Sequence, residues 1–207
     1  MDSTEFFDFL TKWKELVGAA IGGVFALAVA LIVAKDARSR EDRSAAVLLI
    51  VAFTNLAARS NSLSELATAD SVPEADRHSW LADKLSKSSP RLTSLAEAAL
   101  ARLLPVHPIL AVHLELFRTH HAELEAIVSR VAQDYRDLHQ HGRALRPDAV
   151  MDADARNCRS AFEGAVRHGD CASRLIQLFV LSKVPTWNML RYRMAPTQEM
   201  RNCRAPK

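Results

Sequence analysis

Residues 16–34 read LVGAAIGGVFALAVALIVA, and this stretch decides how the chain is organised. Its nineteen residues include no charged or polar side chain. An uncharged apolar run of about 18 residues or more is long enough to cross the hydrocarbon core of a bilayer as an α-helix. The sequence therefore predicts an N-terminal single transmembrane helix.

Small side chains recur at every fourth position of this predicted span: Gly18, Gly22, Ala26, Ala30 and Ala34. Small residues at this spacing let two helices approach closely in lipid, with a right-handed crossing. We therefore predict that the span is a transmembrane association surface, either with a second copy or with another membrane helix. The alternative is that these residues are filler, because Gly and Ala are common in transmembrane helices.

The basic residues near the span are unevenly placed. Two precede it and four follow it: Lys12, Lys14, Lys35, Arg38, Arg40 and Arg43. The positive-inside rule then puts the C-terminal domain in the cytoplasm and the N-terminus outside a bacterial inner (plasma) membrane, in a single pass. Residues predicted to lie at the membrane interface are Trp13, Lys14, Lys35, Arg38, Arg40 and Arg43.

Two further observations bear on this topology. A cleaved signal peptide is the alternative, but its apolar region normally covers about 7–15 residues after a basic start, and here the run is longer and the start is acidic. The three cysteines, Cys158, Cys171 and Cys203, are odd in number and lack CxxC spacing. This pattern favours structural thiols in a reducing compartment over a disulfide framework.

The rest of the chain predicts an all-α protein. Long period-2 alternation is absent, aromatic residues make up only 6%, and eight prolines separate segments with helical periodicity. We expect a short N-terminal tail with an aromatic interfacial helix (residues 1–15), a transmembrane helix (16–34) and a charged juxtamembrane segment (35–44). A cytoplasmic all-helical bundle (45–184) and a basic C-terminal tail (185–207) follow.

Residues 45–58 form a second, shorter apolar run. About fourteen residues are too few to cross a bilayer core of about 30 Å, so a buried core helix is favoured over a re-entrant or second membrane segment. Two helix starts follow. Ser71 and Glu74 have capping-box spacing, and Thr93 or Ser94 precedes another helical segment.

A long antiparallel helix pair, residues 108–141 and 148–183, is predicted to dominate the bundle. Both helices carry apolar residues at alternating spacings of four and three, which is typical of knobs-into-holes packing. The short connection makes the helices antiparallel neighbours. Pairing them about the loop centre places Phe117 opposite Ala172 and Leu124 opposite Ala165.

Histidine is the one compositional anomaly, because six of the eight lie between His107 and His141. The same pairing places His121 opposite His168, with Cys171 one turn away. We weigh three interpretations: a hydrogen-bonded structural histidine, a pH-responsive group, and a metal site made of His121, His168 and Cys171. The structural interpretation is favoured, so we expect no metal site. His121, His168 and Cys171 are kept as secondary candidates for metal ligands.

No catalytic or cofactor signature is present, so we expect no enzyme and no cofactor. The favoured function is a membrane-anchored helical interaction or scaffold protein. Its partners would be the lipid bilayer, a second copy or another membrane helix, and an unidentified cytoplasmic protein. A holin- or toxin-like membrane-active effector and a pH- or metal-responsive sensor are the alternatives. The basic tail favours anionic lipid over nucleic acid, which is an unlikely partner.

Overall fold

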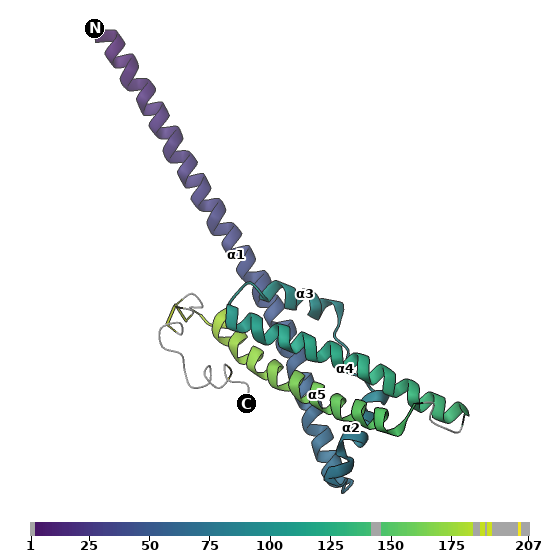
Figure 1. The fold of residues 1–207 in the computed structure, drawn as a ribbon. Coiled ribbons are helices and arrows are strands. Elements are labelled where there is room, and N and C mark those ends of the chain that lie inside the picture. The colour runs from purple at the N-terminus through teal and green to yellow at the C-terminus, as the bar shows by residue number, and fades with distance from the viewer. Residues whose placement is uncertain (1–2, 142–145, 184–186, 189, 192–202, 204–207) are drawn as a thin grey trace. The chain divides into compact units, whose positions relative to one another are not determined.

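The computed structural model describes residues 3–141, 146–183, 187–188, 190–191 and 203 (Figure 1). These described residues form five α-helices and no β-strand, which confirms the all-α prediction. The chain divides into two compact units, Met1–Glu41 and Asp42–Lys207.

Helix α1 spans Ser3–Ala69, so the charged residues after the predicted span continue a helix. Arg40 and Asp36 form an ion pair of 2.8 Å with the i, i+4 spacing that suits a helix surface. Within the described part of the chain, α1 is the one helix long and apolar enough to cross a membrane, judged by length and composition only. Seven large apolar side chains in the part of α1 that belongs to the first unit are 55–68% exposed: Val24, Phe25, Leu27, Val29, Leu31, Ile32 and Val33.

The second apolar run lies in α1 and buries one face only. Its buried side chains are Ala45, Ala46, Leu49, Phe53 and Leu56. On the other face, Val47, Leu48 and Val51 remain 45–53% exposed. The run is therefore a core-facing helix with an uncovered apolar side, rather than a helix buried all round.

The turn that terminates helix α1 contains a residue with left-handed backbone conformation, Ser71. This corrects one sequence prediction. Ser71 has φ of 51°. The N–H of Val72 donates to the carbonyl of Ala67, and the N–H of Ser71 donates to that of Thr68, which is the Schellman arrangement. The capping-box prediction is therefore wrong, because Ser71 closes α1 instead of opening the next helix. A short 3-10 turn, η1 (Glu74–Asp76), precedes α2 (Arg77–Lys87).

Helix α3 (Ser94–Leu103) begins as predicted. The hydroxyl of Thr93 accepts a hydrogen bond of 3.2 Å from the backbone N–H of Ala96, which satisfies one of the unpaired donors of the first turn. This fixes the direction in which the preceding segment, residues 88–93, meets the helix.

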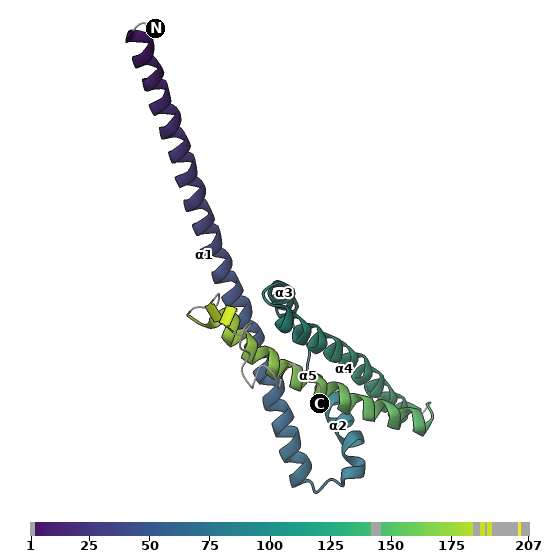
Figure 2. The same cartoon turned by 60° about the vertical axis from the view of Figure 1, so that its left-hand side comes forward.

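Helices α4 (Pro108–His141) and α5 (Asp148–Ile176) run side by side in opposite directions (Figures 1 and 2). Helix α5 continues into a π-helical turn, η2 (Gln177–Leu181). The predicted seams are buried at the described positions from Leu110 to Val131 on α4 and from Ala155 to Phe179 on α5 and η2. The side chains of Leu138 and His141 lie outside the described residues.

The predicted register between α4 and α5 is displaced by about one helical turn. A Cβ added to Gly169 would lie 3.5 Å from the ring of Phe117, so Phe117 packs against α5 at Gly169, three residues before its predicted partner Ala172. The same added atom would lie 3.2 Å from the ring of Phe53. Gly169 therefore lets the rings from α1 and α4 approach the backbone of α5.

An ionic cluster joins α4 and α5 near their connection. The buried carboxylate of Asp154 accepts from Arg146 at 2.6 Å and from Arg130 at 3.2 Å, and Arg146 also pairs with Asp134 at 2.8 Å. The bonds from the two arginines hold the pKa of Asp154 below its usual value, although burial alone would raise it. A buried carboxylate of this kind is tolerated because it is paired.

Candidate functional site

Three histidines from two helices meet inside the second unit. His113 and His120 lie on α4, and His168 lies on α5. The Nδ1 atoms of His113 and His168 are 3.1 Å apart, and both side chains are buried. The rings of His120 and His168 are nearly parallel, with centroids 5.5 Å apart. We call these three residues the histidine cluster.

The geometry of the cluster constrains its protons. A bond between two Nδ1 atoms needs one ring to donate and the other to accept, so both rings cannot be imidazolium at once. Burial, together with the nearby charges of His113, Arg167 and His120, which act in the same direction, lowers the pKa of His168 to about 4. Burial also lowers the pKa of His113. The hydrogen-bonded pair of His113 and His168 is therefore built to hold neutral imidazoles.

Helix α5 makes room for the cluster at Gly164. A Cβ added there would lie 2.8 Å from the His120 ring, closer than real side-chain contacts allow. The Nδ1 atom of His120 is buried without a hydrogen-bond partner, although Glu123 Oε2 lies 3.8 Å away. A buried polar atom left without a close partner costs stability, so the position of His120 is dictated by packing.

His121 does not join His168, which corrects the predicted pairing. The His121 ring lies 5.7 Å from that of Phe117, and its Nδ1 is 3.7 Å from Glu125. Burial lowers its pKa, while the charges of Glu125 and Glu97 act in the opposite direction. Among the described residues, no group of three His, Cys, Asp or Glu side chains is arranged to hold a metal ion. His121, His168 and Cys171 therefore do not form the metal site considered from the sequence.

The cysteines occupy separate environments. Cys158 is fully buried in the α5 seam, and burial raises the pKa of its thiol to about 11. Burial raises the pKa of Cys171 to about 12, and a hydrogen bond with Cys203 contributes in the same direction. Both thiols are thus poor nucleophiles at neutral pH, because the thiolate is the reactive form.

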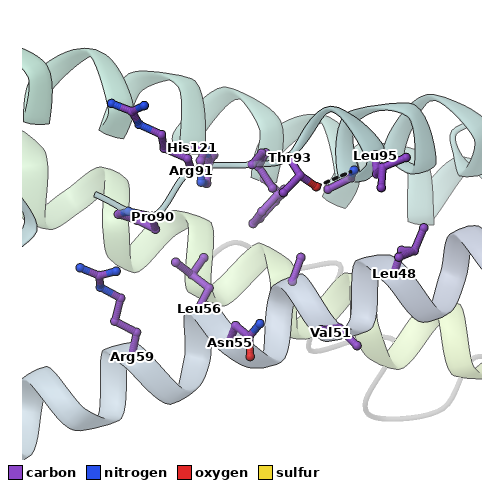
Figure 3. A pocket seen from close by; sticks show the side chains of 14 residues that line it. Leu48, Val51, Asn55, Leu56, Arg59, Pro90, Arg91, Thr93, Leu95 and His121 are labelled. Carbon is purple, nitrogen blue, oxygen red and sulfur yellow. Dashed lines mark hydrogen bonds between the residues drawn. The ribbon is translucent and has the colours of Figure 1, made fainter. Parts of the chain in front are cut away.

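His121 instead lines a cavity of about 340 Å³ between α1, residues 90–93, α3 and α4 (Figure 3). Figure 3 shows Leu48, Val51 and Leu95 toward one end of the cavity, and Arg59 and Arg91 toward the other. The cavity therefore has an apolar end and a cationic end.

The membrane-related residues lie in the first part of α1. Ala26, Ala30 and Ala34 are exposed, and a Cβ added to neighbouring Gly23 would meet no atom within 4 Å. Trp13 is 53% exposed, and Lys35, Arg38, Arg40 and Arg43 are exposed. Gly18 and Gly22 are helical positions, but their surroundings and the side chain of Lys14 lie outside what the structure describes.

Sequence reasoning missed His113 and His120. They are seven residues apart, and the next step of seven reaches Ile127, which is buried. A heptad position beside the predicted seam was therefore also core-facing. The repeat of His113, His120 and Ile127 was the signal that could have identified the cluster.

Comparisons of the chain with protein-family models, with curated proteins and with solved structures give no match.

Proposed function

We propose that this chain is a membrane-anchored helical interaction protein. The observation that supports the proposal is the run of large apolar side chains from Val24 to Val33, exposed by 55–68% within α1. Leaving such a run in water is costly, at about 25 cal/mol per Å² of apolar surface, whereas a bilayer covers it. The helical bundle formed by residues 45–184 would then present its surfaces to a cytoplasmic partner, with the N-terminus outside.

Membrane fractionation with an alkaline carbonate wash tests the anchor. We expect the full chain to stay in the membrane pellet. Phe25→Glu with Ile32→Glu should release it, since each acidic residue at mid-helix costs roughly 2–3.5 kcal/mol of insertion free energy. A matched pair of exposed valines, Val112→Glu with Val150→Glu, should leave the chain in the pellet. Recovery of the wild-type chain in the soluble fraction would refute the anchor.

Self-association through the small-residue face is the second part of the proposal. Replacing Gly22 with Leu is expected to reduce the dimer fraction in membranes about tenfold, because the larger side chain separates the two backbones by more than close packing allows. Energy transfer between fluorescent fusions measures this fraction. Gly23→Leu is the matched control: it adds the same side chain one residue away, where open space surrounds the helix, and should leave association unchanged. Equal loss in both variants would contradict an association face.

A pH-responsive role is a second candidate, favoured by the histidine cluster. Neutral imidazoles from α4 and α5 share one hydrogen bond at 3.1 Å, and protonation of both rings would break it. Acidification would thereby weaken the contact between the two longest helices of the second unit.

A further inference from the structure

We propose that the cavity between α1, residues 90–93, α3 and α4 binds a long-chain fatty acid, with its carboxylate at Arg59 and its acyl chain along the apolar wall. This proposal does not depend on the membrane anchor, because every lining residue belongs to the second unit, Asp42–Lys207.

The cavity has the volume and the apolar lining that an acyl chain needs. Its volume of about 340 Å³ falls in the range of small-molecule sites, about 300–1,000 Å³. Four helix or linker segments supply its apolar side chains: Leu48, Val51, Ala52, Leu56, Leu92, Leu95, Ala96 and Phe117. Three of these, Leu48, Val51 and Leu95, are 45–66% exposed and would be covered by the chain.

The cationic end is supplied by two guanidinium groups. Arg59 comes from α1 and donates a hydrogen bond to the hydroxyl of Ser88, and Arg91 comes from the segment before α3. Figure 3 shows both arginines on the side of the cavity away from Leu48 and Leu95, with Pro90 between their guanidinium groups in this view. Burial lowers the pKa of Arg59, which means that its charge is partly desolvated. An anion beside it would compensate that cost, and guanidinium groups bind carboxylates with two parallel bonds.

The charge of the lining excludes a cationic ligand. Among the fourteen described residues that line the cavity there are two arginines and one histidine, and no carboxylate. Glu125 lies outside this lining, 3.7 Å from the Nδ1 atom of His121, and the charges of Glu125 and Glu97 both act on that side chain. The electrostatic field within the cavity is therefore positive at the arginine end.

Size and polarity select a fatty acid over other anionic ligands. A free inorganic anion would contact the arginines but leave the apolar wall in water. A peptide helix, about 10–12 Å across, is too wide for a cavity of 340 Å³ to enclose even one turn. A single acyl chain with a terminal carboxylate would cover the apolar end of the cavity and pair with the cationic end.

Photolabelling of the full chain in phosphatidylcholine nanodiscs tests the site, with a diazirine analogue of palmitic acid as the probe. We expect labelled peptides from residues 48–59 and 90–96. Arg59→Gln with Arg91→Gln should reduce labelling there about tenfold, since the carboxylate loses its charge-assisted hydrogen bonds. The matched charge control, Arg38→Gln with Arg43→Gln, should leave labelling unchanged.

Competition identifies the ligand class. Palmitate should displace the probe, whereas hexadecanol and inorganic phosphate should not. Ala52→Trp keeps both arginines but fills the cavity, so it should also abolish labelling, and circular dichroism checks that each variant remains folded. Displacement by hexadecanol as effective as by palmitate, displacement by phosphate, or labelling confined to residues 16–34 would overturn the proposal. Failure of the membrane anchor would leave this result intact, because the site lies in the second unit.

Discussion

Replacing Phe117 with alanine is expected to lower the free energy of unfolding by about 3–5 kcal/mol. The side chain is 1% exposed and lies where three helices meet. Its ring stands edge-on to that of Phe53 from α1, with centroids 4.7 Å apart, and it packs on the backbone of α5 at Gly169. Truncation removes these contacts together and leaves a cavity.

The cavity left by Phe117 cannot close easily. Gly169 on the facing helix has no side chain that could turn into the space, and Phe53 is fixed on a continuous helix. Sites that cannot collapse give the large end of the range for core truncations. The loss should therefore exceed that of most core alanine substitutions in this chain.

Denaturant unfolding followed by circular dichroism measures the Phe117 effect. The control is Leu116→Ala, the adjacent residue on the same helix, which is 38% exposed. We expect this control to cost about 1 kcal/mol or less, as a partly exposed position does. Equal losses in the two variants would mean that Phe117 does not anchor the junction of the three helices.

The positions of the helices were predictable because their signals are local. Apolar spacing identified the seams of α4 and α5, and Thr93 identified the start of α3. The continuity of α1 was less visible. Residues 35–44 are charged, and charge alone does not end a helix when i, i+4 pairs such as Asp36 and Arg40 stabilise it.

The register between α4 and α5 could not be read from the sequence. A heptad seam resembles itself when shifted by one turn, so Gly169 and Ala172 are equivalent partners for Phe117 by spacing alone. Phe53 removes this ambiguity, because its ring also needs the space at Gly169. That contact comes from a residue more than a hundred positions before Gly169 in the chain, and no pattern within α4 or α5 reveals it.

The alignment of α4 and α5 decides which histidines lie in each candidate site. The sequence placed His121 opposite His168, whereas the structure places His113 and His120 beside it. His121 turns toward the cavity beside Phe117. Predicting a site between two helices therefore requires the correct register, whereas predicting the helices themselves does not.

Acidification from pH 6.5 to pH 4 is expected to lower the free energy of unfolding by about 2–3 kcal/mol through His168. In the unfolded chain this histidine takes its ordinary pKa near 6.5, whereas burial lowers the native pKa to about 4. The unfolded state therefore binds the proton first as the pH falls. The stabilisation is complete above pH 6.5 and disappears as the pH approaches 4. His113 and His121, whose pKa values are also lowered, act in the same direction.

Denaturant unfolding at a series of pH values between 7.5 and 4 measures this dependence. His168→Gln keeps a polar group beside His113 but cannot titrate, so its stability should change much less with pH than that of the wild type. His141→Gln is the matched control, since it removes a histidine at the last residue of α4. This control should keep the wild-type dependence.

Nuclear magnetic resonance distinguishes the His168 contribution from the titration of carboxylates. The imidazole signals of His168 should titrate well below pH 6.5, because one proton in the His113–His168 bond already satisfies both Nδ1 atoms. Asp154 and Asp152 have lowered pKa values, so their stabilising contribution is lost as the pH falls through the unfolded-state pKa near 4, at the acidic end of this window and below it. A wild-type dependence in His168→Gln, or ordinary titration of His168 near pH 6.5, would show that the cluster is not held neutral and would remove the basis for a pH-responsive contact between α4 and α5.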